Sequence, residues 1–234
     1  MQNSTATLTQ FGPNIWIADG ATVSVAGFRY PTRMAVMRLA DGGLFVWSPV
    51  ALSLELRAAV DVLGPVRFIV APNALHDLYL AAWHSAYPTA QLFAAPRLAA
   101  RRPDFRFAGE LGEAPEMAWA GDIDQVLMRN AITTEAVFFH RASRTVLFTD
   151  LIQHFPRGWF KGWRAIVARL DRMTGPEPAV PQKFRLGFTD RKAVRLALQR
   201  VRAWPAEKVL MAHGAPVTEN GATFIARAFE WLGP

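Results

Sequence analysis

Four segments of the sequence place a metal-binding side chain at the end of a predicted strand. His76 and Asp77 follow FIVA, His140 ends EAVFFH, Asp150 ends TVLFTD, and His213 follows KVLMA. Because the carboxyl ends of strands in a shared sheet lie along one edge, these side chains can converge although they are far apart in the sequence. Histidine and aspartate together can hold a divalent ion, which lowers the pKa of bound water and polarises a scissile bond. The pattern predicts a metal-dependent hydrolytic centre.

The composition narrows the chemistry of such a centre. The chain contains no cysteine, which excludes disulfides, thiolate zinc sites, iron–sulfur clusters and a cysteine nucleophile. Any metal must then be held by histidine, aspartate, glutamate or backbone oxygens. A site poor in nitrogen and rich in carboxylates favours manganese or iron over tight zinc binding. The expected cofactor is therefore one divalent ion, Mn, Fe or Zn.

Each candidate ligand also has a simpler structural explanation. Asp150 can cap the turn or helix that follows it, which is a frequent role for aspartate. His76 and Asp77 can lie in the first turn of a helix, where the helix dipole favours a carboxylate. His213 can bond to a neighbouring loop. The residue types alone leave both explanations open.

His140 is the weakest of these candidates. The alternation of EAVFFH puts Val137 and Phe139 on one face of the strand and Phe138 and His140 on the other. This arrangement favours a core or edge histidine, so His140 is expected to line the pocket at most.

Motifs of other enzyme classes are missing. The sequence has no GxSxG elbow, and Ser48, in VWSPV, is the only serine directly after a strongly predicted strand. It also has no GxGxxG and no GxxxxGK[ST] motif, so dinucleotide and phosphate-loop chemistry find no support.

The pattern of apolar residues and turn signals predicts mixed α and β structure. Strands are expected over 14–18, 22–28, 33–39, 44–48, 67–71, 91–95, 124–130, 135–140, 145–150 and 208–212. Helices are expected over 54–63, 76–86, 160–173, 190–203 and 222–232, and residues 97–121 read as an irregular surface excursion. Each half has several strands followed by helix–strand–helix, so two sheets packed face to face with helices outside would bury both apolar faces.

Three of these segments resemble the metallo-β-lactamase superfamily, over about residues 14–231. They are the strand, turn and helix at 67–86, VLFTDL at 146–151, and VLMAHG at 209–214. The resemblance implies a single-domain, four-layer αβ/βα sandwich over 1–234, with two mixed sheets, helices outside and a covering helical segment at 155–205. In the family, the aspartate after the middle strand bridges two metals and the late histidine completes the second site. Asp150 and His213 match these positions.

The first ligand motif departs from the family's HxHxDH. Read without gaps, the motif falls on Asn73 to Leu78, and only Asp77 agrees with it. Shifted by one residue, it puts His76 at the family's aspartate and Asp77 at its last histidine. Asp77 is then a ligand and also the expected catalytic group, and Asn73 is expected in the pocket. Both registers remain open.

The family's middle histidine is also missing. It is expected near residues 131–135, where only Glu135 could replace it. The chain also resembles an uncharacterised branch of the superfamily in which Asn-x-x-His, FFH, TDLI and AHG occur together. That branch often has histidine where this chain has Asp77, and it implies no established substrate.

The positive charge is concentrated in one region. The formal net charge is +7, and residues 157–202 alone carry +9. The simplest explanation is a solvated face in a chain that uses arginine far more often than lysine throughout. A positive face can also attract anionic ligands or lipids, whereas nucleic-acid binding is not expected. The segment 155–173 mixes aromatic and basic residues, and we expect a covering helix that packs Trp159, Trp163, Ile166 and Leu170 inward. Peripheral membrane contact through 155–173 is the alternative.

The sequence gives no sign of export or membrane insertion. It has no apolar run of about 18 residues, and residues 1–16 lack the basic and apolar regions of a signal peptide. We therefore expect a cytoplasmic protein.

Two hypotheses about function follow. The first is a hydrolase with one divalent ion that acts on an ester, thioester, amide or phosphoester. The second is a non-catalytic descendant of the fold that binds a small anionic ligand or a protein partner. The retained Asp150 and His213 favour the first hypothesis, and the missing histidines favour the second.

Overall fold

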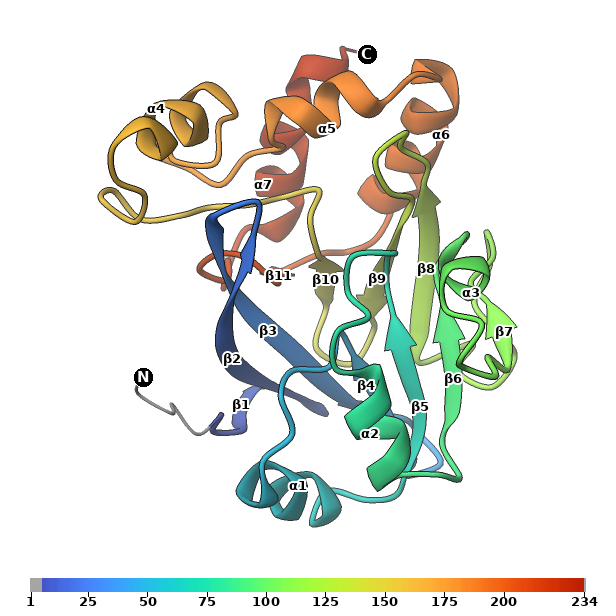
Figure 1. Cartoon of the computed structure of the whole chain (residues 1–234). Helices are drawn as coiled ribbons and strands as arrows, with labels where there is room; N and C mark the ends of the chain where they lie inside the picture. The colour runs from blue at the N-terminus through green and yellow to red at the C-terminus, as the bar shows by residue number, and fades with distance from the viewer. Residues whose placement is uncertain (1–5, 234) are drawn as a thin grey trace.

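The computed structural model describes residues 6–233, which form two mixed sheets with helices on their outer faces (Figure 1). The first sheet is antiparallel from β1 to β4 and parallel from β4 to β7. Its seven strands follow chain order: β1 Thr9–Gly12, β2 Ile15–Val25, β3 Phe28–Arg38, β4 Leu44–Trp47, β5 Val66–Ala71, β6 Gln91–Ala94 and β7 Gly109–Glu110.

The second sheet has the order β11-β10-β9-β8. Its strands are β8 Ile123–Met128, β9 Glu135–His140, β10 Thr145–Phe148 and β11 Lys208–Met211. Strands β8, β9 and β10 pair antiparallel, and β10 and β11 pair parallel.

The helices lie in two layers on the outside of the sheets (Figure 1). The first sheet is covered by α1 Leu54–Asp61, α2 Leu80–Ala86 and α3 Leu98–Arg101. The second is covered by α5 Gln182–Gly187, α6 Arg191–Arg202, α7 Gly221–Ala228 and the 3₁₀ helix η1 Glu230–Leu232. The predicted αβ/βα sandwich with two mixed sheets is therefore confirmed.

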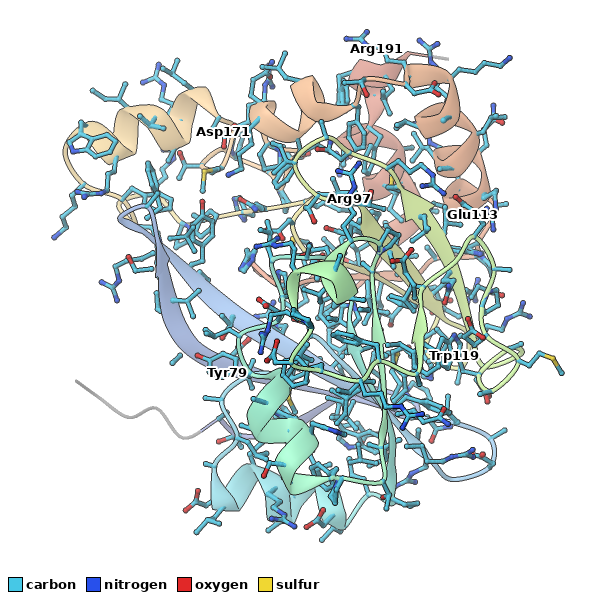
Figure 2. All side chains as sticks on the ribbon, turned by 45° about the vertical axis from the view of Figure 1, so that its right-hand side comes forward. Tyr79, Arg97, Glu113, Trp119, Asp171 and Arg191 are labelled. Carbon is cyan, nitrogen blue, oxygen red and sulfur yellow. The ribbon has the colours of Figure 1, made fainter. Side chains whose placement is uncertain are left out.

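Helix α4, Trp163–Leu170, stands apart from these layers above the tip of the β2–β3 hairpin (Figure 1). Asp171 ends this helix and lies between α4 and α5 (Figure 2). Its carboxylate accepts a 2.7 Å hydrogen bond from the backbone N–H of Lys183 in α5. Asp171 therefore links α4 to the helical layer.

The two sheets meet in an aromatic core. Phe45 of the first sheet packs edge to face on Phe138 of the second, with ring centroids 5.5 Å apart, and on Trp119 at 5.2 Å. All three side chains are fully buried. Edge-to-face rings add about 0.5–1.5 kcal/mol per pair beyond the burial of their area. This core fixes how the edges of the two sheets face each other.

Several element boundaries differ from the sequence-based expectation. The strands expected at 14–18 and 22–28 form one strand, β2, which continues through an irregular register between Gly20 and Val23. Helix α2 begins at Leu80 rather than at residue 76, so His76 and Asp77 lie in a turn before the helix. The short elements β1, β7, α3 and α5 lacked a clear periodic signal because each has only two to six residues.

No helix within residues 6–233 is long and apolar enough to cross a membrane.

We predict that Phe45→Ala lowers the free energy of unfolding by about 3–5 kcal/mol, because it leaves a cavity where the two sheets meet. Leu54→Ala is the control, since Leu54 is 82% exposed, and its effect should stay within about 0.5 kcal/mol. Urea denaturation measures both. Equal effects would contradict the assignment of Phe45 to the core between the sheets.

Candidate metal centre

The candidate site lies where the strand ends of the two sheets meet. In the first sheet, β4 and β5 run parallel, and Ser48 and His76 follow their carboxyl ends. In the second sheet, β10 and β11 run parallel, and Asp150 and His213 follow theirs. Each sheet thus supplies part of the site, and the shared core holds the parts together.

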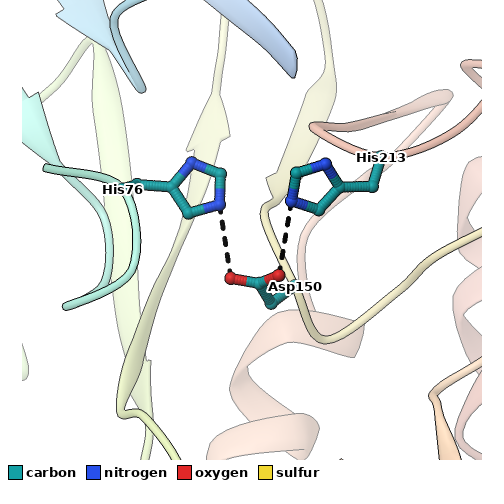
Figure 3. Close-up of side chains that lie close together, drawn as sticks. All are labelled: His76, Asp150 and His213. Carbon is teal, nitrogen blue, oxygen red and sulfur yellow. Dashed lines mark ion pairs between the residues drawn. The ribbon is translucent and has the colours of Figure 1, made fainter. Parts of the chain in front are cut away.

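Three of the predicted ligands converge (Figure 3). Nε2 of His76 is 3.2 Å from Oδ2 of Asp150, and Nε2 of His213 is 3.3 Å from Oδ1 of the same carboxylate. One donor atom from each of the three residues lies within 4.8 Å of the others. The three side chains are at most 10% exposed.

Both imidazole rings are held through their other nitrogen. Nδ1 of His213 lies 2.6 Å from the carbonyl oxygen of Pro31, and Nδ1 of His76 lies 2.8 Å from Oγ of Ser48. A carbonyl oxygen only accepts hydrogen bonds, so Nδ1 of His213 must carry a proton and donate it. Protein ligands to metals are commonly oriented in this way.

The protonated Nδ1 of His213 has a consequence for its Nε2. In the neutral ring, Nε2 carries a lone pair, and this lone pair faces the lone pairs of the Asp150 carboxylate. That contact is repulsive unless the ring takes up a second proton or a cation lies between the two groups. The two Nε2 atoms lie 3.2 and 3.3 Å from different oxygens of one carboxylate, and one donor atom from each residue lies within 4.8 Å of the others. Histidine nitrogens and a carboxylate are donor types that divalent ions bind. The donor set therefore fits a divalent ion.

Asp150 is held as a carboxylate by its neighbours. Nδ2 of Asn73 donates a 2.8 Å hydrogen bond to Oδ2, and Nε2 of Gln153 donates a 3.1 Å bond to Oδ1. Burial raises the pKa of Asp150, but the hydrogen bonds and the positive charge of the protonated His213 and His76 rings outweigh it and hold the pKa well below the usual value. Asp150 is thus ionised and oriented.

Glu135 lies beneath the cluster rather than in it. Its carboxylate accepts hydrogen bonds from the backbone N–H groups of Thr149, Asp150 and Leu151 at 2.7–3.1 Å. Burial and the nearby charge of Asp150 raise the pKa of Glu135 to about 7. Glu135 therefore shapes the turn that presents Asp150 and does not replace the missing histidine as a converging ligand.

Asp77 lies next to His76 in the sequence, but its carboxylate is held elsewhere. It forms a 2.8 Å ion pair with Arg102, which also pairs with Asp104. Arg101 donates to the carbonyl of Ala74, so the end of α3 supports the whole turn. The structure does not bring Asp77 into the cluster, and the one-residue shift of the ligand motif places only His76 there.

His140 is far from the cluster, which corrects its expected place in the pocket. It ends β9 opposite Thr145, the first residue of β10, whereas Asp150 follows the last residue of β10. His140 therefore lies at the other end of the sheet, where its Nδ1 pairs with Ser143 at 2.7 Å. The direction of β9 explains the error: antiparallel strands put their carboxyl ends at opposite edges.

The loop that carries His213 is fastened to the first sheet. Arg33 in β3 donates hydrogen bonds to the carbonyl oxygens of Met211 and Gly214 and pairs with Asp19. A Cβ atom at Gly214 would lie 3.0 Å from the carbonyl oxygen of His154. Glycine therefore permits the close approach of the two loops.

Three residues support the ligands in ways that the sequence did not predict: Ser48, Pro31 and Gln153. Ser48 has φ 52°, a left-handed conformation that is uncommon for serine. The sequence feature that could have predicted this role is the position of Ser48 directly after β4, because β4 pairs with β5, the strand that leads to His76. A carbonyl such as that of Pro31 leaves no trace in the sequence. Gln153 Oε1 is buried without a hydrogen-bond partner among residues 6–233.

The cluster opens into a cavity of about 540 Å³. Its rim includes the exposed apolar side chains of Val25, Leu75, Leu78 and Ile132. Lys183 also lines the cavity. Burial lowers the pKa of Lys183, but the nearby Tyr30 and Asp171 outweigh this effect and raise it. The cavity thus combines an apolar rim with one cationic side chain.

Solved structures with this architecture decide the fold. A crystal structure of the DIM-1 metallo-β-lactamase exposed to ceftazidime has a TM-score of 0.66 and 12% identity, over 99% of both chains. A metallo-β-lactamase from Hirschia baltica has a TM-score of 0.64 and 15% identity, over 95% of this chain and 97% of that one. The chain has the metallo-β-lactamase fold.

A third structure with this fold is the metallo-β-lactamase FIM-1 from Pseudomonas aeruginosa in its mono-zinc form. It has a TM-score of 0.63 and 12% identity, over 100% of this chain and 99% of that one. By sequence, a family described as a domain of unknown function, DUF4336, matches residues 13–101. No curated protein matches the chain. At these sequence identities the structural similarity establishes the fold alone. The activity must be inferred from the residues of the site.

We predict that His140 makes stability fall with acidity. Burial lowers its pKa to about 4, whereas an unfolded histidine titrates near 6.5. Between these values the unfolded chain binds more protons, so the free energy of unfolding falls as the pH drops from about 6.5 to 4. The full effect is on the order of 3 kcal/mol.

Urea denaturation in the presence of a chelator, at several pH values, measures this dependence. His140→Gln keeps a polar group beside Ser143 but cannot titrate, so its curve should lack this part of the slope. Equal slopes for the two proteins would contradict the prediction.

Proposed function

We propose that the chain is a hydrolase that holds one divalent ion through His76, Asp150 and His213. The convergence of these three donors, with both rings fixed through Nδ1, carries the proposal. Two histidines and one carboxylate form a three-ligand set of the kind that catalytic zinc and non-haem iron sites use. When bound, the ion would supply the acidity that activates water and the charge that polarises the scissile group.

The residues around the ligands have supporting roles in this proposal. Asn73 and Gln153 orient the Asp150 carboxylate, and Ser48 and the Pro31 carbonyl orient the rings. Only one ion is proposed because neither register of the first motif supplies its two early histidines, and Glu135 stands in the region of the middle one. Zinc is the first ion to test, since the similar FIM-1 structure is of a mono-zinc form. Manganese and iron follow.

The cavity favours a substrate with an apolar part and an anionic group. The rim residues Val25, Leu75 and Leu78 offer apolar contact, and Lys183, which pairs with Asp171 at 3.1 Å, offers an ammonium group as a hydrogen-bond donor. Esters, thioesters, phosphoesters and amides, β-lactams among them, are the candidate bonds. This is a substrate class for screening.

A second candidate activity rests on Ser48. Its Oγ lies 2.8 Å from His76 Nδ1, and the other nitrogen of His76 lies 3.2 Å from Asp150. A serine, a histidine and an aspartate in this order could transfer an acyl group without a metal. The left-handed backbone at Ser48 matches the strain often stored at such residues. In this alternative Ser48 is the nucleophile rather than a support for His76.

We predict that the purified protein, prepared without a histidine tag, binds close to one equivalent of Zn, Mn or Fe. Asp150→Ala and His213→Ala should each lose it, because two remaining ligands hold a metal poorly. Elemental analysis after incubation with each ion measures the content. His84→Ala is the matched control, since it removes a histidine from α2, outside the cluster. A folded wild-type protein that takes up no metal would overturn the proposal and favour the non-catalytic alternative.

We predict that the metal-loaded protein hydrolyses at least one substrate class and that Asp150→Ala lowers kcat/KM at least 100-fold. Ser48→Ala should lower kcat/KM less, by about tenfold, since it removes only the hydrogen bond that orients a ligand. Activity that survives a chelator, falls with Ser48→Ala and accompanies labelling of Ser48 by a fluorophosphonate would instead support the serine mechanism. Full metal occupancy without any hydrolysis would reject catalysis for the classes tested.

A further inference from the structure

Helix α4 carries an apolar stripe on its outer face. Trp163, Ile166, Val167 and Leu170 are spaced i, i+3, i+4 and i+7, which puts them on one side of a helix. They are 57%, 64%, 40% and 72% exposed. The expectation that Trp163, Ile166 and Leu170 pack inward is therefore wrong.

The inner face of α4 is made of small residues. Ala168 is fully buried and Ala165 partly so, and both pack on a cluster formed by Phe155, Phe160 and Met173. Trp159, before the helix, is the one member of the expected inward set that packs there, and its Nε1 donates to the carbonyl of Arg29. The larger side chains of α4 are thus left for contact with something outside the chain.

Basic side chains surround this stripe. Within residues 6–233, none of those on or beside α4 forms an ion pair. They are Arg157, Lys161, Arg164, Arg169 and Arg172. An amphipathic helix with a broad apolar face and unpaired basic residues at its borders is typical of binding in the plane of an anionic membrane surface.

A basic pocket opens at the C-terminal end of the stripe. It has a volume of about 540 Å³, and Leu170 of the stripe lines it. Arg169, Arg172 and Arg185 also line it, none of them in an ion pair within residues 6–233, together with Arg227, which pairs with the one acidic lining residue, Glu177. Such a pocket suits the phosphate of a lipid headgroup.

We infer that α4 docks this protein on the surface of an anionic phospholipid bilayer. The apolar stripe enters the boundary between headgroups and acyl chains, and the basic residues contact lipid phosphates. The charges argue against a second copy of the chain, because two such faces would bring like charges together. An anionic bilayer complements both the stripe and its basic border.

The docking surface extends toward the mouth of the candidate metal centre. Phe28, at the β2–β3 hairpin, packs edge to face on Trp163 with centroids 5.8 Å apart. Val25, at the tip of the same hairpin, is 59% exposed and also lines the metal-site cavity. A docked protein would therefore hold this cavity close to the lipid. The docking itself requires no metal and no hydrolysis.

We predict that the full chain sediments with vesicles that contain phosphatidylglycerol and much less with pure phosphatidylcholine. Leu170→Glu should lower the partition coefficient at least tenfold, because it places an acid in the stripe. Lys161→Gln should lower it about fivefold, the loss expected for one basic residue at an anionic surface. Leu196→Glu is the matched control, since Leu196 is 55% exposed on α6, and it should bind as the wild type does.

Circular dichroism melting would confirm that the variants are folded. Wild-type protein that fails to bind anionic vesicles would overturn the inference. So would equal losses for Leu170→Glu and Leu196→Glu, which would indicate a general effect of charge. A dimer in light scattering that Leu170→Glu dissociates would assign the stripe to a second copy instead.

Discussion

The candidate site depends on one buried carboxylate that two imidazoles share. Asp150 lies between His76 and His213, with an Nε2 atom about 3.2–3.3 Å from each of its oxygens. A buried carboxylate is costly unless it is paired or hydrogen-bonded. Because His213 already donates its Nδ1 proton to Pro31, a neutral His213 ring cannot also donate to Asp150. The geometry is stable only with an extra positive charge, and that charge is either a proton or a metal ion.

A second buried carboxylate, Glu135, adds to the need for a positive charge in the site. Glu135 is completely buried close to Asp150, and Nδ2 of Asn73 lies 2.8 Å from one carboxylate and 3.4 Å from the other. Backbone N–H groups satisfy the oxygens of Glu135 but contribute no full charge. Because the pKa of Glu135 is raised to about 7, this carboxylate adds a second negative charge above that pH. A divalent cation at the point where the three donor atoms converge would balance the charge of both carboxylates.

Strand periodicity predicted two sheets with outer helices and put His76, Asp150 and His213 at strand ends, and the resemblance to the metallo-β-lactamase superfamily predicted the type of sandwich. The carboxyl ends of β5, β10 and β11 could be located from apolar runs, which gave His76, Asp150 and His213. The same reasoning misplaced His140, since a run of apolar residues does not reveal the direction of its strand in the sheet. It also could not foresee that Arg102 holds Asp77, because α3 has only four residues and no amphipathic pattern. Predictions from apolar periodicity therefore miss contacts made by short elements and by backbone carbonyl groups.

Helix α4 shows the same limit in another form. The helical periodicity located the apolar stripe from Trp163 to Leu170. It did not show what the stripe faces, since such a stripe can pack on the core, on lipid or on a partner protein. The composition of the opposite face decides between these. The small side chains of Ala165 and Ala168 let the helix backbone lie close to the aromatic cluster of Phe155 and Phe160. This contact already buries the inner face of α4. Four large apolar side chains then remain outside, bordered by arginines and a lysine that form no ion pair within residues 6–233. A surface with that composition is explained by what it binds rather than by the stability of the fold.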